Sequence, residues 1–195
     1  MVHVVSSSKF AIKAQEAGCD AVVAEGFEAG GHNGKEETTT MVLIPLIKNA
    51  VHIPVIAAGG IATGRQMLAA MVLGADAVQI GSRFVCTPEA SSHQNFKEAI
   101  LHATEGDTML SIKKVVPVRL LKNKFATTIQ TAEAEGATAS ELQTILGRAR
   151  AKKGMFEGDM EEGELEIGQV SSMIHSIKPA AEIVQEIWND FKEQL

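Results

Sequence analysis

The residues with the clearest chemical potential lie in the glycine-rich stretch AEGFEAGGHNG, from Ala24 to Gly34, which directly follows an apolar run. Glycine is used where the backbone takes unusual angles or lies close against another group. The histidine in this stretch, His32, has a side chain that can move a proton near neutral pH. The stretch therefore predicts either a ligand loop overlooked by His32 or a tight structural turn.

Two further glycine turns follow apolar runs. AAGGIATG places Gly59 and Gly60 at the end of one predicted strand, and QIGSRF places Gly81 and Ser82 at the end of the next. Backbone N–H groups at the start of a helix attract a phosphate when no side chain blocks the approach. A single GG turn is most often a simple bend. Two such turns in consecutive units predict a phosphate site.

The two glycine turns can form one site only if the fold brings them together. The chain alternates between predicted strands and helices, which is a pattern that does so. The expected strands are 2–7, 20–26, 53–60 and 76–84, and the expected helices between them are 9–18, 38–51 and 64–74. Pro45 should kink the helix of 38–51 or mark its true start. The pattern predicts an α/β fold of about four βα units on a parallel sheet, with all βα loops on one face. His32 then shares a face with the phosphate site.

The second part of the chain is predicted to be mainly helical. QNFKEAILHATEG reads as a helix, TMLSIKKVVPVRLLKNKF as a short strand with an irregular segment, and TASELQTILGRARAKKG as a helix capped by Thr138 or Ser140. The closing segment KPAAEIVQEIWNDFKEQL is an amphipathic helix with Pro179 in its first turn. We expect residues 1–110 to form one domain and residues 111–195 an extension packed on it.

Two segments of the chain are rich in charge. The basic stretch KKVVPVRLLKNK, residues 113–124, is expected to be a solvated face, or else a docking patch for an acidic carrier or a phosphorylated cofactor. The acidic run from Glu157 to Glu166 is expected to be a solvated loop. Neither segment carries a pattern that decides between surface and function.

Composition excludes several classes of function. A net charge of −6 argues against nucleic acid or an anionic membrane as partner, and no apolar run is long enough to span a bilayer. The start of the chain lacks the features of a secretion signal, which predicts a cytoplasmic protein. Cys19 and Cys86 are expected to be buried free thiols. No histidine or cysteine spacing indicates a metal site, and neither a dinucleotide-binding G-x-G-x-x-G after a strand nor a P-loop occurs.

Four stretches resemble a known family of flavoproteins. They are VVAEGFEAGGH, IPVIAAGGIATGRQMLAAMVLGADAVQIGSRFV, PVRLLKNKF and EGDMEEGELEIGQV. They are similar to the nitronate monooxygenase family, which includes the former 2-nitropropane dioxygenases and the FMN-dependent enoyl-acyl-carrier-protein reductases II. The resemblance implies a (β/α)8 TIM barrel that binds FMN at the carboxyl ends of its strands. It assigns FMN contacts to Glu25, Gly30, Gly59, Gly60, Gln79, Ile80, Gly81 and Ser82, and the catalytic role to His32.

The length of the chain is short for this fold. A (β/α)8 barrel typically takes about 250 residues, and residue 2 corresponds to what looks like the fifth strand. We therefore expect the C-terminal half of a TIM barrel, followed by the helical extension. Half a barrel leaves bare strand edges and an exposed apolar interior. It should need the missing N-terminal half or a second copy of itself, and we expect a homodimer.

The resemblance leaves three activities open. NAD(P)H-dependent reduction of an enoyl thioester, with a small-molecule or acyl-carrier-protein-linked substrate, is the first expectation, because PVRLLKNKF and the segment after it look more like the reductase branch. Oxidation of alkyl nitronates with O2 is the alternative. The third is an inactive, truncated half-barrel without normal flavin binding. The sequence does not distinguish NADH from NADPH.

Overall fold

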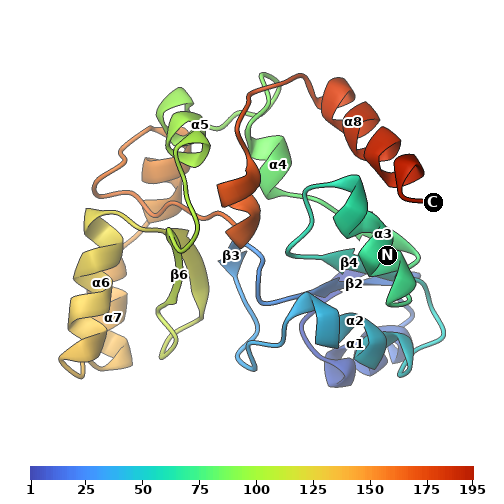
Figure 1. Ribbon diagram of the computed structural model, residues 1–195. Coiled ribbons are helices and arrows are strands. Elements are labelled where there is room, and N and C mark those ends of the chain that lie inside the picture. Colours follow the sequence, from blue (N-terminus) through green and yellow to red (C-terminus); the bar gives the residue numbers. More distant parts are fainter.

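The four apolar runs of the first part form one parallel sheet in the computed structural model, which describes residues 1–195 (Figure 1). The strand order is β1 (Val2–Val5), β2 (Ala21–Glu25), β4 (Val55–Ala58) and β5 (Ala77–Gln79). The helices that follow these strands are α1 (Ser8–Glu16), α2 (Thr40–Lys48), α3 (Gly64–Val72) and α4 (Ser82–Val85). The prediction of about four βα units on a parallel sheet is therefore confirmed.

The core of this part lies around the two central strands. Val22 of β2 pairs with Val55 of β4, and both side chains are fully buried against Leu43 and Ile47 of α2. Branched apolar residues suit such positions because they pack well on a pleated surface covered by helices. The edge strand β1 is more open, with Val2 and Val4 about half exposed. The sheet thus presents its central strands, and the loops after them, in a fixed position.

Two boundaries differ from expectation. Pro45 does not mark the start of α2, which begins five residues earlier at Thr40. Pro45 has no N–H to donate to the carbonyl of Met41, one turn earlier in the helix. Because Met41 is exposed, water can reach this carbonyl, and the helix tolerates the proline. The strand expected over 76–84 is also wrong beyond Gln79. Gly81 takes a helical ψ of −68°, and its carbonyl accepts the N–H of Phe84, so the chain turns directly into α4.

A second, antiparallel sheet holds a strand that the sequence did not reveal. It joins β3 (Gly31–His32), β7 (Val118–Leu121) and β6 (Thr108–Ser111) in that order. The segment expected to hold one short strand therefore supplies two. Helices α6 (Lys124–Ala134) and α7 (Ala139–Leu146) lie beside this sheet, and Phe125 and Ile129 of α6 pack on its buried side chains (Figure 1). The second sheet thus attaches His32 to the C-terminal part of the chain.

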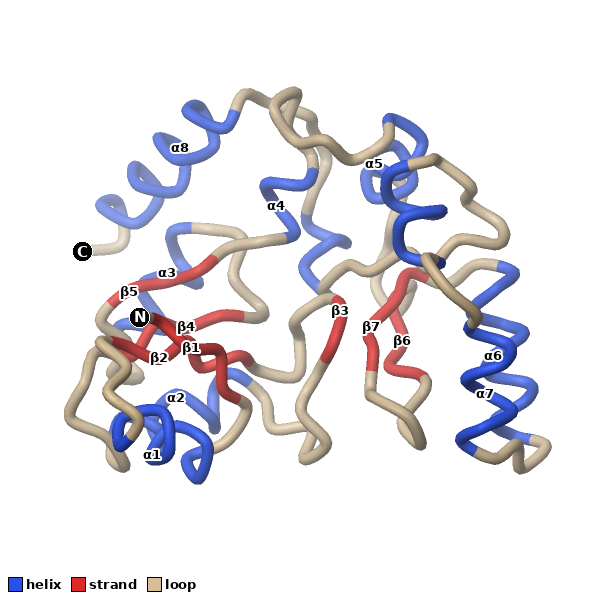
Figure 2. The backbone as a smooth tube through the Cα atoms, turned by 180° about the vertical axis from the view of Figure 1, so that it is seen from behind, coloured by secondary structure: helices blue, strands red, loops and turns tan.

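The remaining elements complete the C-terminal part. They are α5 (Gln94–Leu101), a π-helical turn (Lys152–Phe156), a 3-10 turn (Gln169–Met173) and α8 (Ala180–Glu193). Thr138 caps α7 through a reciprocal pair of hydrogen bonds with Glu141, which confirms Thr138 rather than Ser140 as the cap. Helix α8 starts directly after Pro179 and packs on α3, so the end of the chain returns to the first sheet (Figure 2).

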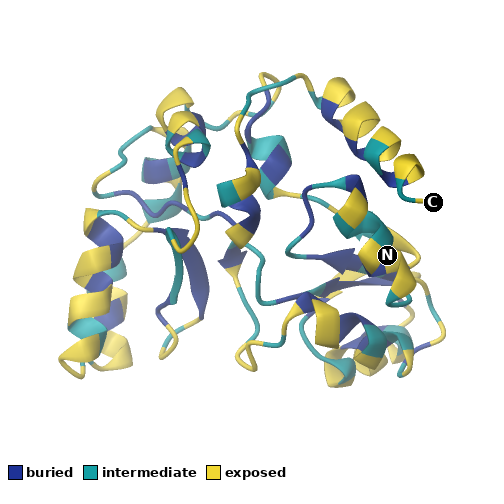
Figure 3. Ribbon diagram, viewed as in Figure 1, coloured by how far each residue is buried: buried dark blue, intermediate teal, exposed yellow.

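Burial follows this arrangement. The strands and the inner faces of the helices are buried, whereas the outer faces of α6, α7 and α8 are exposed (Figure 3). Both cysteines are free and buried, as expected. No helix has the length and apolarity that crossing a lipid bilayer requires. The expected boundary between residues 110 and 111 falls within β6, and the division into two domains remains a prediction.

Candidate functional site

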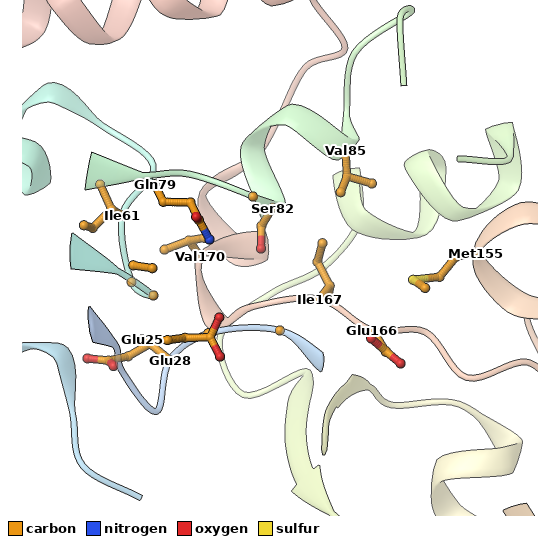
Figure 4. A pocket seen from close by; sticks show the side chains of 16 residues that line it. Glu25, Glu28, Ile61, Gln79, Ser82, Val85, Met155, Glu166, Ile167 and Val170 are labelled. Atoms are coloured by element: carbon orange, nitrogen blue, oxygen red, sulfur yellow. The ribbon is translucent and has the colours of Figure 1, made fainter. Parts of the chain in front are cut away.

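A cavity of about 210 Å³ lies at the carboxyl ends of β2, β4 and β5 (Figure 4). Sixteen residues line it: Glu25, Glu28, Ala29, Gly30, Ala58, Gly59, Gly60, Ile61, Gln79, Gly81, Ser82, Val85, Met155, Glu166, Ile167 and Val170. In open parallel sheets, ligands bind in the crevice beyond the carboxyl ends of the strands. This position and the glycine turns around it make the cavity the candidate ligand site.

The two glycine turns supply free hydrogen-bond donors to this cavity. The backbone N–H groups of Gly60, Ile61 and Gly81 donate to no acceptor within the chain. Gly59 and Gly60 have positive φ angles of 88° and 72°, a region that glycine adopts without strain. A Cβ at Gly59 would also lie 2.8 Å from the carbonyl oxygen of Gly26. The turns therefore have the free donors that an anion such as a phosphate requires, and the phosphate site itself remains a prediction.

Ser82 begins α4 and connects the first sheet to a later segment. Its hydroxyl oxygen accepts the N–H of Gly168 at 3.0 Å, which holds residues 166–170 against the cavity. A hydroxyl can accept one bond and still donate its own hydrogen. Gly30 contributes to the same junction, because a Cβ there would lie 2.4 Å from the carbonyl carbon of Ile167. The cavity is thus closed by contacts between the βα loops and the C-terminal part.

Two carboxylates from the glycine-rich stretch line the cavity. Burial raises the pKa of Glu25, which ends β2. Glu28, which sequence reasoning missed, accepts the N–H of Thr40 at 2.9 Å and the Thr40 hydroxyl at 2.8 Å. These bonds anchor the loop to the first residue of α2. Glu28 lies within EGFEAGGH, between other predicted site residues, and this position could have indicated that it lines the cavity.

The acidic run is not the solvated loop that we expected. Glu164 is only 7% exposed and Glu166 lines the cavity, whereas Glu161 earlier in the run is exposed. Leu165 and Ile167 alternate with the two carboxylates and are buried in a hydrophobic cluster. Alternation of apolar and polar residues indicates a half-buried extended segment. This four-residue pattern was present in the sequence but lay inside a run dominated by charge.

The basic segment is only partly a solvated face. Its lysines are exposed, but Val118 to Leu121 form the buried strand β7. Arg119 is 2% exposed and donates two hydrogen bonds to the carbonyl of Phe27, at 3.1 and 2.9 Å. Its guanidinium also lies over the Phe27 ring, 4.4 Å from the centroid. Arg119 therefore braces the loop before Gly30 and is not available to a docking partner.

The structure gathers seven of the nine predicted site residues around one cavity. They are Glu25, Gly30, Gly59, Gly60, Gln79, Gly81 and Ser82. Ile80 instead packs its side chain on the cluster around Ile44 and Ala57. His32 is exposed on β3 and does not line the cavity, although its neighbour Gly30 does. The catalytic role of His32 and the ligand contacts of the other residues remain predictions.

Glu164 is expected to make stability depend on pH. Burial, with the nearby charge of Glu166, raises its pKa from 4.5 to about 7. The folded state therefore holds this proton more tightly than the unfolded state, and the stabilisation is lost as pH rises from about 4.5 through 7. Glu164→Gln is neutral at every pH, so it should raise the free energy of unfolding by about 1–2 kcal/mol at pH 8 and by much less at pH 5.

Urea unfolding at the two pH values measures this difference. Glu161→Gln removes a charge from the exposed part of the same run and should change stability little at either pH. An equal gain at pH 5 and pH 8 would show that the Glu164 carboxyl is not the source.

This chain resembles the proteins of one known family. The family model described as nitronate monooxygenase matches residues 1–190. The chain belongs to the nitronate monooxygenase family. Its structure is similar to that of FabK from Thermotoga maritima, with a TM-score of 0.92 and 43% identity over 99% of this chain and 61% of that one. It is also similar to nitroalkane oxidase from Streptomyces ansochromogenes, with a TM-score of 0.80 and 30% identity over 98% of this chain and 57% of the other.

The curated relatives have names of the same family. A protein of Staphylococcus haemolyticus named probable nitronate monooxygenase is 43% identical over 133 residues, which cover 63% of this chain and 37% of that protein. One from Staphylococcus aureus with the same name is 33% identical over 99% of this chain and 56% of its own length. The chain therefore spans about half the length of the curated relatives it matches. The parallel α/β fold is shared with these enzymes, while the half-barrel remains a prediction.

Proposed function

We propose that this chain is the catalytic part of an FMN-dependent oxidoreductase of the enoyl-acyl-carrier-protein reductase II type, with NADH or NADPH as reductant. The observation that carries the proposal is the cavity at the strand ends, which is lined by two glycine turns whose N–H groups have no acceptor within the chain. Similarity to FabK at 43% identity over nearly the whole chain supports the reductase branch. The substrate is an enoyl thioester, small or linked to acyl carrier protein.

The residues present fit FMN. Gly60, Ile61 and Gly81 provide free N–H donors for the phosphate, and Gly81 leaves open space, because a Cβ there would meet no atom within 4 Å. Gln79 and Glu25 line the same cavity and supply polar groups for the rest of the cofactor. When bound, FMN supplies the hydride chemistry, and the protein supplies position and electrostatics.

His32 gives or takes the proton that accompanies this chemistry. Reduction of an enoyl thioester adds a hydride to the β-carbon and a proton to the α-carbon, so a proton donor is required on the second side. The imidazole is suited to that role near neutral pH. His32 does not line the cavity, so in this proposal the acyl chain extends beyond the lining, past Gly30, to meet the imidazole.

Nitronate oxidation is the second candidate. The names of the curated relatives and the likeness to nitroalkane oxidase favour it. In that reaction His32 would abstract a proton from the nitroalkane or hold the anionic nitronate. The same cavity serves both reactions, so the choice depends on substrate and not on cofactor.

One set of assays tests both candidates. The purified chain, mixed with excess FMN and freed of unbound flavin, should retain a yellow colour with absorbance near ~450 nm. Consumption of NADH and of NADPH with crotonyl thioester should exceed the rate without the thioester, and oxygen uptake with an alkyl nitronate should be the slower reaction. Oxygen uptake with the nitronate alone would overturn the reductase in favour of the monooxygenase. A colourless preparation would overturn both and support the inactive fragment.

A further inference from the structure

Thr40, the first residue of α2, lies behind the first glycine turn and is buried, with 8% of its surface exposed. It does not line the cavity, so it can act on a ligand there only through other groups. We propose that Thr40 is a positioning residue, whose hydroxyl holds the Gly59 carbonyl and thereby turns the Gly60 N–H toward the phosphate of FMN. This inference deepens the proposed function and rests on it for the identity of the ligand.

The Thr40 hydroxyl is the donor that the Gly59 carbonyl lacks from the backbone. Its Oγ1 atom lies 2.9 Å from the carbonyl oxygen of Gly59, and no backbone N–H donates to that oxygen. Backbone carbonyls that are shielded from water nearly always have a hydrogen-bond partner. The contact with Thr40 therefore meets a requirement of the fold and fixes the carbonyl in one direction.

The same hydroxyl has two other acceptors within reach, and it has only one hydrogen to donate. Oε2 of Glu28 lies 2.8 Å away, but it also accepts the backbone N–H of Thr40 at 2.9 Å. The carbonyl of Ala58 is farther, at 3.5 Å, and accepts the N–H of Gly26 at 2.9 Å. Because the Gly59 carbonyl has no second donor, we assign the hydroxyl hydrogen to it.

The peptide group between Gly59 and Gly60 converts this bond into a direction. The chain has no cis peptide bond, and in a trans peptide the C=O and N–H groups point to opposite sides. With the carbonyl held toward Thr40, the Gly60 N–H points away from Thr40. Both glycines line the cavity and Thr40 does not, which leaves the cavity as the space that this N–H faces. The N–H has no acceptor within the chain, as a donor kept for a ligand requires.

Two glycines make room for the contact. A Cβ on Gly26 would overlap Oγ1 of Thr40, and a Cβ on Gly59 would lie 2.8 Å from the carbonyl oxygen of Gly26. Gly59 also has a φ of 88°, which side chains other than glycine rarely allow. A larger residue at position 26 would push the hydroxyl away from the turn. The glycine-rich stretch and the first glycine turn therefore meet at Thr40.

Thr40 also offsets a charge that would oppose a phosphate. Glu28 lines the same cavity, and a Cβ on Gly60 would lie 3.5 Å from its carboxyl carbon. The backbone N–H of Thr40 donates to both carboxylate oxygens, at 3.2 and 2.9 Å, at the positive end of α2. This donor belongs to the backbone and remains in every variant at position 40. A change of the hydroxyl alone therefore tests the side chain and not the capping of α2 by Glu28.

Affinities of the full chain for FMN and for riboflavin form the first test. Riboflavin has the same ring and sugar alcohol without the phosphate, so the ratio of the two Kd values isolates the phosphate contact. Thr40→Val removes the hydroxyl and should raise the Kd for FMN about tenfold, the usual effect of one hydrogen bond to a charged group. The Kd for riboflavin should change less than about twofold. Thr40→Ser keeps the hydroxyl and should retain most of the FMN affinity.

Thr39→Val is the matched control for this test. Thr39 is exposed, and its side chain makes no capping hydrogen bond to α2, so both Kd values should stay at the native level. Equal weakening of FMN and riboflavin in Thr40→Val would mean a general loss of structure and would overturn the positioning role. Unchanged FMN binding in Thr40→Val would overturn it as well.

The second test measures the peptide group directly and needs no ligand. When all glycines carry 13C at the carbonyl and 15N at the amide, only Gly30–Gly31 and Gly59–Gly60 join two labelled atoms in one peptide group. A spectrum that correlates these nuclei therefore has two signals, and the one that moves in His32→Gln belongs to Gly30–Gly31. The carbonyl frequency of the other should change in Thr40→Val, stay near the native value in Thr40→Ser and be unaffected by Thr39→Val.

The two tests separate this inference from the proposed function. A Gly59 carbonyl signal that is the same in the native chain and in Thr40→Val overturns the hydrogen bond, whether or not flavin binds. If the native chain binds FMN no more tightly than riboflavin, the turn does not hold the phosphate and the inference is overturned, while the enzyme assays can still support the proposed function. If the native chain retains no flavin, the proposed function fails, and the carbonyl signal still decides whether Thr40 holds the turn.

Discussion

Replacing His32 with alanine is expected to lower turnover by about 10²–10⁴, the usual effect of losing an acid–base group, with FMN still bound. The separation of the two effects follows from the structure. His32 is exposed on β3 and contributes nothing to the cavity lining, whereas the glycine turns that would hold the phosphate are on β4 and β5. The measurement is steady-state turnover with crotonyl thioester, or with a nitronate, alongside the Kd for FMN from quenching of flavin fluorescence.

A matched control keeps this prediction specific. His52, an exposed histidine on the loop before β4, lies outside the cavity lining, so His52→Ala should leave both turnover and FMN binding unchanged. If His32→Ala turns over substrate at the native rate, His32 has no part in the reaction. If FMN binding is lost together with turnover, the loop before β3 holds the cofactor, and the assignment of the phosphate to the other two turns is wrong.

The first sheet could be predicted because its signals are local. Each strand is an apolar run of strand length that ends in a glycine turn, and segments with helical periodicity separate the runs. Each of these patterns predicts its element from neighbouring residues alone. Two neighbouring turns such as Gly59–Gly60 and Gly81–Ser82 then meet by the geometry of any parallel sheet, so seven predicted residues share one cavity.

The second sheet could not be predicted in the same way. Strand β3 has only two residues, too few for any periodicity, and its partner β7 lies 86 residues farther along the chain. Such long-range pairing is chosen by tertiary contacts and not by local preference. The placement of His32 away from the cavity lining depends on this pairing. Glu166, which lines the cavity, was hidden for another reason, since five of the ten residues before it are acidic and mask the short alternation of ELEI.

Gly81→Asp is expected to weaken FMN binding about 100-fold or more. Gly81 lies at the N-terminus of α4 with a free N–H, where we place the phosphate, and a carboxylate there would face a ligand of the same charge. Like charges brought together at an interface cost several kcal/mol, and each 1.4 kcal/mol is a factor of ten in Kd. The fold should tolerate the change, because Gly81 has a φ of −102° and a Cβ would meet nothing within 4 Å.

Gly81→Asn separates charge from bulk in this prediction. Asparagine has the size of aspartate without its charge, and it can donate a hydrogen bond to a phosphate. Its effect on the Kd should therefore be at most about tenfold, and the difference between the two variants should shrink with added salt, because ions screen exposed charges. Equal loss in both variants would mean that the space beside Gly81, and not an anion, is what the ligand requires. Unchanged binding in both would place the phosphate away from α4, and the free N–H groups of Gly60 and Ile61 would have to hold it without the second turn.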